Sequence, residues 1–546
     1  MILPVHDERD DRTVRVLAEL VGPERAGLAY THFVGAEVRL SSTVETLGSP
    51  NGYVAFMAAA NMLTRFVGSV RLAVIGRCPP ALGAMLETDL ERLRRIDTRQ
   101  GKVLALGFAP GESPDIALHI GNSEQDLGPA AGLRVQVSFD GWSLSVGSGV
   151  RACAPVRPSC VPFGAIAGAC FGVAEVFKHV LTRVAPDVQA RRTLTSRLVE
   201  AYSYSTWTAD RVPAPPSAWD ARAWEDELDV AALLQVGAGA VGNASLYVLS
   251  SARSLHGVVT VLDEKLVDQK NLNRCLLFLE EDVGQAKVDV VRDKATRAGL
   301  IVTAKREAFA PQPDAGSSIV LSTVDNNAVR HLMQESLPRF LVQGSTSGTS
   351  VAVSVHSAVD GLSCLVCRHP DPTGGLPRIR ALTVAETAAR LGVDERVVAS
   401  GEFEDGQVIT DELIARVRIR DAQAAVFLEA ARDSGKDLCG TLGEFRRQYG
   451  LLEAPQEPSV PFVSVFAGLQ AAAEVVKLRL RDRGIDAPVL QNVLEIDLAR
   501  DYTRHARLSY DQERLSDCPL CVQRESQVRR LYREKWGPWP QPMSRR

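Results

Sequence analysis

The stretch that decides the fold is residues 230–242, which read VAALLQVGAGAVG. Its first seven residues form a near-continuous apolar run, typical of a strand buried on both faces of a parallel sheet. In the glycine loop that comes next, Gly237 is placed for a tight turn, Gly239 for close backbone approach to a phosphate, and Gly242 for packing of the next helix. We therefore expect a nucleotide-binding strand–loop–helix unit, and this pattern alone fits NAD, FAD or ATP equally well.

Acidic residues end two of the apolar strands expected after this loop. Residues 257–262 read GVVTVL and are followed by Asp263, about twenty residues beyond the loop, where a ribose hydroxyl needs a carboxylate acceptor. Residues 318–324 read SIVLSTV and are followed by Asp325. An acid at the carboxyl end of a parallel strand faces the ligand crevice, so Asp325 is well placed to hold Mg²⁺.

Basic residues between these strands discriminate among nucleotides. Residues 271–274 read NLNR, and Lys287 lies further on. The phosphates of a dinucleotide can be held by backbone amides and a helix dipole, whereas a triphosphate being cleaved needs positive charge to stabilise the transition state. Arg274 and Lys287 together can supply that charge, although either one alone would be interpreted as a solvated surface residue.

Two Cys-x-x-Cys pairs, Cys364/Cys367 and Cys518/Cys521, are the most specific local signal in the chain. Each pair can present two thiolates from one turn, and two such pairs suit tetrahedral Zn²⁺. Because a shell of four thiolates leaves no open coordination site, we expect a structural metal that ties the end of the chain back to the domain. The alternative is a set of reduced thiols without a metal.

Composition indicates the broad class of protein. The chain has 546 residues, 45% hydrophobic and 23% charged, which is ordinary for a globular protein with more than one domain. A formal net charge of −4 gives no electrostatic reason to expect a nucleic-acid or membrane partner. The N-terminus lacks a signal-peptide pattern, and no uninterrupted apolar run is long enough to span a bilayer. With ten cysteines, four of them in close pairs, we expect a cytoplasmic protein.

The chain divides into two related halves, separated by the proline-rich residues 212–217. Residues 161–178 and 460–477 both begin Val-Pro-Phe and end in a Glu/Lys turn. This match predicts a corresponding buried helix in each half, and the alternative is two unrelated alanine-rich helices. Residues 36–75 show strand, turn, helix and strand patterns without the glycine spacing, so we expect an N-terminal nucleotide-binding fold that has lost its nucleotide.

In this combination the motifs resemble the ThiF/MoeB/ubiquitin-activating (E1-like) superfamily of adenylating enzymes. The matching segments span about residues 228–522 and are the glycine loop, the strand ending at Asp263, residues 271–274, Lys287, residues 324–326, both cysteine pairs, residues 439–443 and the Pro461 helix. The resemblance implies that ATP and Mg²⁺ bind and that the C-terminal glycine of a small β-grasp protein is adenylated. It places Asp263 on the ribose, Asn271, Arg274 and Lys287 on the phosphates or the attack, and Asp325 on Mg²⁺.

Two positions depart from the family pattern. Ala240 stands where many members have glycine, a tolerable change if this residue keeps a negative φ. Cys275 stands where glutamine commonly follows the arginine, and we interpret it as a packing residue rather than a catalytic one.

Cys439 is predicted to be the nucleophile. It lies between the first cysteine pair and the Pro461 helix, where thioester-forming members of the family carry theirs. Residues 383–449 are helix-rich and charged and resemble an inserted catalytic-cysteine domain. A thiolate is a good nucleophile toward an acyl adenylate, and the alternative is a buried core thiol. The remaining unpaired cysteines are expected to be small buried hydrophobes: Cys78, Cys153, Cys160, Cys170 and Cys275.

The expected fold class is α/β, with tandem Rossmann-like (ThiF-type) doubly wound domains, an inserted helical catalytic-cysteine region and a zinc site. The expected divisions are 1–211 for a degenerate, inactive adenylation domain, 212–227 for a linker, 228–367 for the first part of the active domain, 368–450 for the insertion, 451–522 for the second part with the zinc closure, and 523–546 for a tail without an assigned fold. In this family the partner domain also contributes an arginine from its N-terminal helix to the opposite ATP site. Arg12 or Arg15 could serve, although a plain helix-face charge is the simpler interpretation.

The leading functional hypothesis is activation of a ubiquitin-like protein: adenylation of its C-terminal glycine, thioester formation on Cys439 and transfer to a conjugating (E2-like) enzyme. Bacterial systems with this equipment, some of them antiphage defence operons, are the nearest analogue. Two paired halves imply a pseudo-dimer within one chain, and a homodimer of chains stays open.

Four alternatives remain. Adenylation of a sulfur-carrier protein (ThiF/MoeB-like) would need neither the insertion nor a pseudo-domain, and adenylation of a ribosomal peptide occurs in natural-product maturation. A degenerate scaffold would not need Arg274, Lys287 and Asp325. An NAD oxidoreductase would leave the cations and the metal cysteines unexplained.

Overall fold

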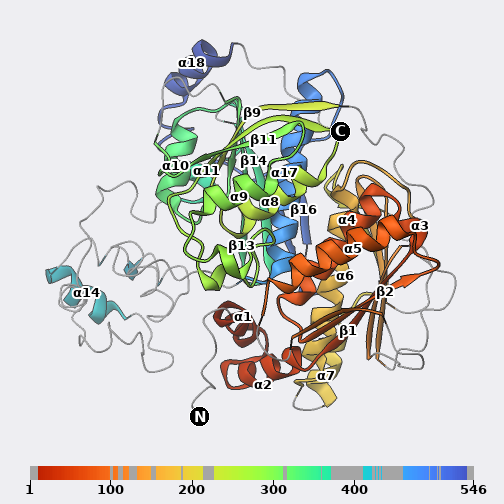
Figure 1. The fold of residues 1–546 in the computed structure, drawn as a ribbon. Helices are drawn as coiled ribbons and strands as arrows, with labels where there is room; N and C mark the ends of the chain where they lie inside the picture. Colours follow the sequence, from red (N-terminus) through yellow and green to blue (C-terminus); the bar gives the residue numbers. More distant parts are fainter. Residues whose placement is uncertain are drawn as a thin grey trace. The chain divides into compact units, whose positions relative to one another are not determined.

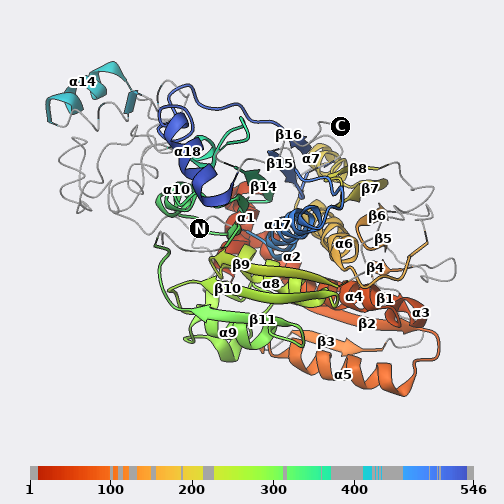
Figure 2. The ribbon, with the colours of Figure 1, turned by 90° about the horizontal axis from the view of Figure 1, so that it is seen from above.

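The structure is a computed structural model (Figures 1 and 2) that describes residues 10–98, 102–107, 115–121, 132–148, 155–185, 188–212, 227–310, 317–357, 359–370, 410–420, 425, 428–429, 432, 459–490, 492–500, 502 and 506–537. The chain divides into two compact units. One consists of Met1–Leu365 with Pro458–Arg546, and the other of Val366–Glu457. The second unit contains α14 (Asp411–Arg420), and the division falls inside the short helix α11 (Leu365–Arg368).

The N-terminal half of the first unit is built on one eight-stranded sheet in the order β3-β2-β1-β4-β5-β6-β7-β8. Its strands are β1 (Glu37–Thr43), β2 (Ser69–Ile75), β3 (Val103–Leu106), β4 (Ile116–Ile120), β5 (Leu133–Phe139), β6 (Ser143–Ser148), β7 (Ala201–Ser205) and β8 (Asp210–Arg211). Its helices are α1 (Asp11–Val21), α2 (Pro23–Val34), α3 (Val44–Leu47), α4 (Pro50–Thr64), α5 (Pro80–Arg94), α6 (Phe163–Thr182) and α7 (Val188–Thr195).

The C-terminal half is built on a second eight-stranded sheet in the order β11-β10-β9-β12-β13-β14-β15-β16. Its strands are β9 (Leu228–Val236), β10 (Leu255–Leu262), β11 (Leu300–Lys305), β12 (Ile319–Ser322), β13 (Phe340–Ser347), β14 (Ser350–His356), β15 (Val493–Asp497) and β16 (Ala506–Tyr510). Its helices are α8 (Ala240–Ser251), α9 (Lys287–Ala295), α10 (Asn327–Glu335), α17 (Pro461–Asp482) and α18 (Glu525–Trp536), with 3-10 turns η1 (Gln269–Asn271) and η2 (Glu280–Asp282).

The two sheets have the same topology strand for strand. In each, the first five strands of the order pair in parallel and the last three pair antiparallel. This repetition confirms the predicted fold class of tandem Rossmann-like α/β units. The strands and helix predicted over residues 36–75 are β1, α4 and β2, and those predicted at 230–236 and 257–262 are β9 and β10. The predicted strand 318–324 is shorter, as β12.

The matching sequences 161–178 and 460–477 form the long helices α6 and α17, which lie side by side between the two sheets (Figure 2). Both are long and apolar enough to cross a membrane by length and composition alone. However, 94% of the apolar window of α6 and 100% of that of α17 are buried inside the protein, so both serve as core helices. Close packing against neighbouring elements explains why these helices contain small residues. A Cβ placed on Gly468 of α17 would lie 2.5 Å from the carbonyl oxygen of Val241, so α17 contacts the backbone of α8.

Each of these helices carries a completely buried ion pair that reaches the other half. On α17, Lys477 Nζ lies 2.6 Å from Glu474 Oε1 and donates a 2.9 Å hydrogen bond to the carbonyl oxygen of Trp207 in the N-terminal half. On α6, Lys178 pairs with Glu175, which accepts a 2.5 Å hydrogen bond from the hydroxyl of Tyr502 in the C-terminal half.

The pairing is therefore reciprocal. It confirms that the sequence match reflects a structural repeat, because the Glu/Lys turn of each half forms a buried ion pair that hydrogen-bonds to the other half. We call this contact between the halves the junction.

The two halves differ at the carboxyl ends of their central strands. In the C-terminal half, β9 leads through the glycine loop into α8. In the N-terminal half, β1 leads into the extra helical turn α3, whose Thr46 amide is capped by the Thr43 side chain. A Cβ on Gly121, which follows β4, would lie 2.4 Å from Thr46 Oγ1, so α3 fills the crevice there. This filling fits the expectation that the N-terminal half has no nucleotide site of the usual form, which stays a prediction.

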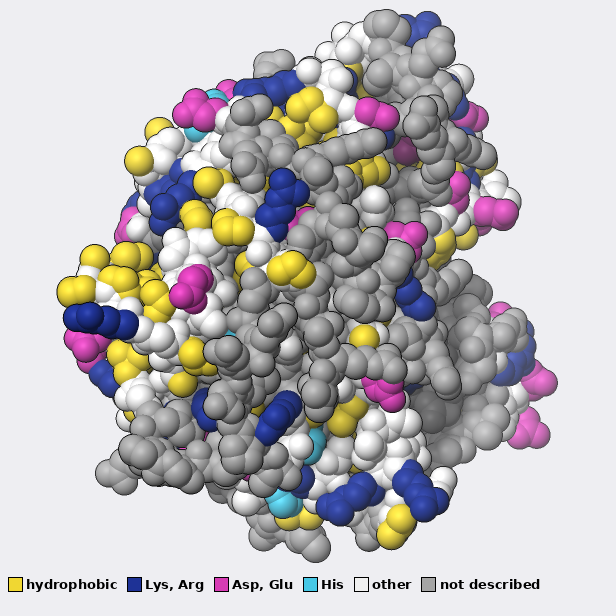
Figure 3. Space-filling model, turned by 90° about the vertical axis from the view of Figure 1, so that its right-hand side faces the viewer, with side chains coloured by type: hydrophobic (Ala, Val, Ile, Leu, Met, Phe, Trp, Pro, Cys, Tyr) yellow, Lys and Arg dark blue, Asp and Glu magenta, His cyan; other side chains and the backbone are white. Residues whose placement is uncertain are grey.

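Two further features concern the surface. The tail left without a fold in the sequence contains α18, whose Trp536 indole donates to the Leu337 carbonyl and whose Tyr532 hydroxyl donates to the Arg339 carbonyl. Sequence periodicity missed it because half of its residues are charged and most are exposed. On the face shown in Figure 3, positive and negative side chains of the described residues lie interspersed, in keeping with the net charge of −4.

Replacing Lys477 by Met should destabilise the junction of the halves by about 3–5 kcal/mol, because the Glu474 carboxylate would remain buried without its partner. Urea unfolding of the full chain, followed by tryptophan fluorescence, measures the loss. Arg530→Met is the control, since Arg530 Nε lies 3.9 Å from Glu534 on the exposed face of α18 and should matter by about 1 kcal/mol or less. Equal losses in both variants would contradict this account of the junction.

Candidate nucleotide site and metal centre

The glycine loop has the geometry of a phosphate-binding turn. Gly237 has a φ of +103°, a left-handed conformation that favours glycine. A Cβ on Gly242 would lie 2.2 Å from the carbonyl oxygen of Gly237, so α8 can start against the loop only without a side chain there. A Cβ on Gly239 would meet nothing within 4 Å, which leaves open space beside the loop. Ala240 begins α8 with an ordinary negative φ, so its departure from the family pattern causes no strain.

Two residues that the sequence analysis gave no role hold this loop in place. Gln235 Nε2 donates 3.0 Å hydrogen bonds to the carbonyl oxygens of both Gly237 and Gly242, and Thr323 Oγ1 donates to that of Gly237 at 2.9 Å. Gln235 is the only polar residue in the stretch 230–236 and is fully buried. A polar residue inside an apolar strand was the signal that could have identified it, because such a group must be hydrogen-bonded.

Asp263 lies beside the loop, as its position after β10 predicted. Its Oδ2 accepts a 2.8 Å hydrogen bond from the Ala238 amide and its Oδ1 accepts one from the Lys265 amide, also at 2.8 Å. The carboxylate is half-buried. It therefore stabilises the loop and keeps acceptor capacity for the hydroxyl groups of a ribose.

Residues 271–274 are buried in an irregular stretch that starts at η1. Asn271 Oδ1 accepts a 3.0 Å hydrogen bond from the Asp268 amide, which makes this side chain part of a capping box. The guanidinium of Arg274 donates to the Lys270 carbonyl at 2.7 Å and to Asn273 Oδ1 at 2.8 Å. Lys287 is buried at the first position of α9. The solvated-surface alternative for Arg274 and Lys287 is thus wrong.

The electrostatic environment links these cations to the acids. Burial lowers the pKa of Arg274, while Cys275, Asp325 and Asp268 act in the opposite direction. Burial likewise lowers the pKa of Lys287, and the nearby Asp263 carboxylate opposes this shift. Buried cations with acids close by form a site that favours an additional anion such as a phosphate.

Asp325 lies exposed where the chain leaves β12, directly before Asn326, whose side chain caps α10 by accepting a 2.9 Å hydrogen bond from the Ala328 amide. An exposed carboxylate at the carboxyl end of a parallel strand offers oxygen ligands of the kind that Mg²⁺ prefers.

The N-terminal helix α1 brings Arg12 to this site. Arg12 is 7% exposed, and its pKa is lowered by burial and by the neighbouring Arg274, with Cys275 and Asp325 raising it. Asn273 Nδ2 contacts the adjacent Thr13 hydroxyl at 3.3 Å. Arg15 is exposed. The simpler interpretation of both arginines as plain helix-face charges is therefore wrong for Arg12. It is a residue of the N-terminal half beside the cations of the C-terminal half.

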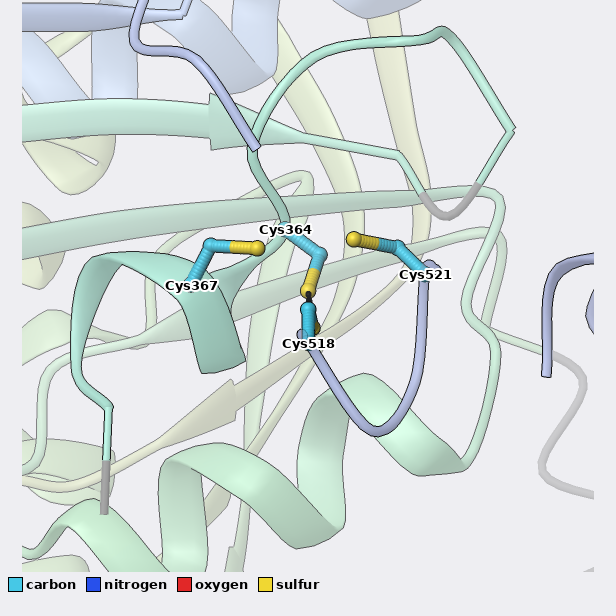
Figure 4. A group of neighbouring side chains, drawn as sticks. All are labelled: Cys364, Cys367, Cys518 and Cys521. Carbon is cyan, nitrogen blue, oxygen red and sulfur yellow. Dashed lines mark hydrogen bonds between the residues drawn. The ribbon is translucent and has the colours of Figure 1, made fainter. Parts of the chain in front are cut away.

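Cys364, Cys367, Cys518 and Cys521 form a second, separate site (Figure 4). All four side chains are 2% exposed or less, and their sulfur atoms lie within 4.8 Å of one another. The sulfurs of Cys364 and Cys518 are 3.7 Å apart. Zinc–sulfur bonds of about 2.3 Å in a tetrahedron would place sulfurs about 3.8 Å apart, so the cluster fits Zn²⁺. The four side chains point toward one another from α11 with its preceding loop and from the loop before α18.

Cys439, the predicted nucleophile, lies outside the described residues, as does Cys153. Of the other unpaired cysteines, Cys170 and Cys275 are buried in the core as expected. The same expectation is wrong for Cys160, which is exposed, and for Cys78, which is half-buried.

These features define the class of protein: a tandem Rossmann-like α/β protein with a glycine loop of the phosphate-binding type and a four-cysteine cluster. The family model of ThiF matches residues 221–520, more than half of the chain, and the chain therefore belongs to the ThiF family. A second family model, the BilD N-terminal domain, matches residues 37–198 in the N-terminal half.

Individual relatives agree with this assignment. The "Uncharacterized protein y4jF" of Sinorhizobium fredii is 26% identical over 432 residues, covering 75% of this chain and 76% of that protein. "Adenylyltransferase and sulfurtransferase MOCS3" of Culex quinquefasciatus is 30% identical over 155 residues, covering 27% and 35%. "Adenylyltransferase and sulfurtransferase UBA4" of Meyerozyma guilliermondii is 29% identical over 170 residues, covering 29% and 38%. The chain thus spans little more than a third of the last two proteins. Together with the family match, they support an adenylyltransferase.

The purified full chain should contain about one zinc ion, because four buried thiolates form a closed tetrahedral shell. Inductively coupled plasma mass spectrometry measures the content. Cys518→Ser should lose the metal, whereas Cys275→Ser, which alters a buried thiol outside the cluster, should keep it. Zinc retained in Cys518→Ser, or absent from the wild type, would contradict a zinc centre here.

Proposed function

We propose that this protein uses ATP and Mg²⁺ to adenylate the C-terminal glycine of a small ubiquitin-like β-grasp protein, and that Cys439 then takes over the acyl group as a thioester for a conjugating (E2-like) enzyme. The observation that carries the first step is the gathering of Arg12, Arg274 and Lys287 with two acids beside the glycine loop.

This cation set favours a triphosphate over a dinucleotide. Two phosphates that are only held can rely on amides and the start of α8. Cleavage between phosphates spreads negative charge over the leaving group, and buried guanidinium groups stabilise it without reorganisation. Arg12 and Arg274 are both buried, and Arg274 lowers the pKa of Arg12, so a bound anion would relieve the repulsion between them.

The first step can be written atom by atom. An oxygen of the glycine carboxylate attacks the α-phosphorus of ATP, the bond from that phosphorus to the bridging oxygen breaks, and pyrophosphate leaves with the electron pair. In this scheme the Gly239 backbone and the amides of the loop hold the phosphates, and Asp263 accepts from the ribose hydroxyls. Arg12, Arg274 and Lys287 hold the anionic leaving group. Bound Mg²⁺, for which Asp325 would supply a carboxylate ligand, neutralises phosphate charge.

In the second step the Cys439 thiolate attacks the acyl carbon, a carbon–sulfur bond forms, and AMP leaves with the carboxylate-derived oxygen. This step is proposed from the position of Cys439 within the unit Val366–Glu457, between the two parts of the ThiF-type domain. The unit is an insertion that the adenylation step itself does not need. A role in bacterial antiphage defence and a cytoplasmic location, which suits a chain with ten cysteines, belong to the same proposal.

A second candidate is adenylation of a sulfur-carrier protein. The partial likeness to two proteins named adenylyltransferase and sulfurtransferase favours it. Both candidates share the adenylation step and differ in the fate of the acyl adenylate, since the acyl group of a sulfur carrier would be attacked by an external sulfur donor such as sulfide, giving a thiocarboxylate and AMP, rather than by Cys439.

Arg12→Ala should reduce ATP–pyrophosphate exchange by about 10²–10³-fold, because one donor to the developing negative charge is lost. The assay contains a β-grasp protein ending in glycine, ATP and Mg²⁺. Arg15→Ala is the matched control from the same helix, and it should retain the wild-type rate because Arg15 is exposed. Equal rates in both variants would show that α1 contributes no arginine to the site.

Cys439→Ala should abolish the thiol-sensitive adduct with the β-grasp protein on non-reducing gels and leave pyrophosphate exchange intact. The same substitution at Cys160, an exposed cysteine in the N-terminal half, should keep the adduct. An adduct that persists in Cys439→Ala would remove this residue as the nucleophile, and a thiocarboxylate product that forms in place of the adduct when sulfide is added would favour the sulfur-carrier candidate.

A further inference from the structure

The segment of residues 271–279, which carries Arg274, is buried yet mostly irregular. Every side chain from Asn271 to Leu279 is 6% exposed or less, while regular helical structure ends with η1 at Asn271. Some of its carbonyl groups accept from local amides, as that of Asn271 does from the Arg274 and Cys275 amides. The carbonyl groups of Leu272, Leu276 and Phe278 accept instead from side chains of another part of the chain. The group that supplies those donors determines where the backbone on both sides of Arg274 lies.

Arg65 of the N-terminal half supplies them. It caps the C-terminal end of α4 and is 2% exposed. Its guanidinium donates to the carbonyl oxygens of Leu272, of Leu276 at 3.0 Å and of Phe278 at 3.3 Å. Its Nε donates to Asn61 Oδ1 at 2.9 Å, which fixes the plane of the group.

Asn61 adds a second anchor from the same helix, because its Nδ2 donates a 3.1 Å hydrogen bond to the carbonyl oxygen of Leu276. On the opposite side, Asn243 of α8 accepts a 2.9 Å hydrogen bond from the Leu277 amide. The segment is thus held between the helix of one half and the helix that starts at the glycine loop of the other.

We infer that Arg65 is a positioning residue for the nucleotide site: by clamping the carbonyl groups on both sides of Arg274, it fixes the guanidinium of Arg274 relative to the phosphates. This inference rests on the proposed function. The N-terminal half, although it has no glycine loop of its own, then contributes twice to the site, with Arg12 directly and with Arg65 through the backbone of residues 271–279.

The hydrogen bonds from residue 65 to these three carbonyl groups require an arginine. A guanidinium is planar and presents five donors in a fixed fork, which lets one side chain satisfy carbonyl groups that lie in different directions. A lysine ammonium is a point donor on a flexible stem and cannot reach all three carbonyl groups at once. Arg65→Lys therefore keeps the buried charge and removes the geometry.

The test compares Arg65→Lys with Arg479→Lys in the full chain. Arg479 is a matched control, since it is 8% exposed and donates to the Val230 carbonyl at 3.0 Å, at the other end of β9 from the glycine loop. Two readouts are taken below the melting temperature of both variants: hydrogen exchange of the amides of residues 271–279, and the kinetics of ATP–pyrophosphate exchange.

Arg65→Lys should speed hydrogen exchange in residues 271–279 and lower kcat and kcat/KM together by about 10²-fold, because misplacement by about 1 Å is enough to weaken transition-state contacts. Arg479→Lys should do neither. In the Arg274→Ala background the effect of Arg65→Lys on the rate should largely vanish, since the two residues act as a unit. A merely structural role would give the same loss in both backgrounds.

Failure of the inference and failure of the proposed function are separable. A wild-type chain that exchanges no pyrophosphate with any β-grasp protein defeats the proposed function, and this inference with it, before any variant is measured. An active wild type whose rate is unchanged by Arg65→Lys, or whose residues 271–279 exchange no faster, defeats the inference alone.

Discussion

The structure depends on the contact between α6 and α17, where each half of the chain places a buried Glu–Lys pair against the other. Lys477 on α17 donates to Trp207 of the N-terminal half, and Glu175 on α6 accepts from Tyr502 of the C-terminal half. A buried ion pair is costly unless its remaining hydrogen bonds are made. Here they are made partly within each half and partly to the other half. The pairs therefore help to specify how the halves meet, and in this arrangement α1 and α4 contact residues 271–279.

The two halves that meet at this junction differ in the crevice at the carboxyl ends of their central strands. The two sheets share one topology, but α3 fills the crevice of the first and the glycine loop opens that of the second. In the proposed function, one chain therefore has one nucleotide site, and residues of the other half support that site. Arg12, Arg65 and Asn61 all come from that half and all approach residues 271–279 or the cations around them.

Much of this could be predicted from the sequence because local patterns carry it. The apolar run, the glycine spacing and the acids at strand ends each report on residues close together in the chain, and the repeated Glu/Lys turn reports on the symmetry. Arg65 and the burial of Arg12 could not be found in this way. Their partners lie more than 200 residues away, and an arginine at the end of a helix has the same local signature whether it faces solvent or clamps a distant loop. The helix α18 was not predicted from the sequence for a different reason, since a charged surface helix has little apolar periodicity.

The central claim is that the two halves build a single ATP site together, and a crystal structure of the full chain with ATP and Mg²⁺ tests it most directly. The account predicts the triphosphate against the Gly239 turn, with the guanidinium groups of Arg12 and Arg274 both on its phosphates and Asp325 at the metal. A nucleotide bound there without Arg12, or bound only in the N-terminal half beside α3, would contradict it.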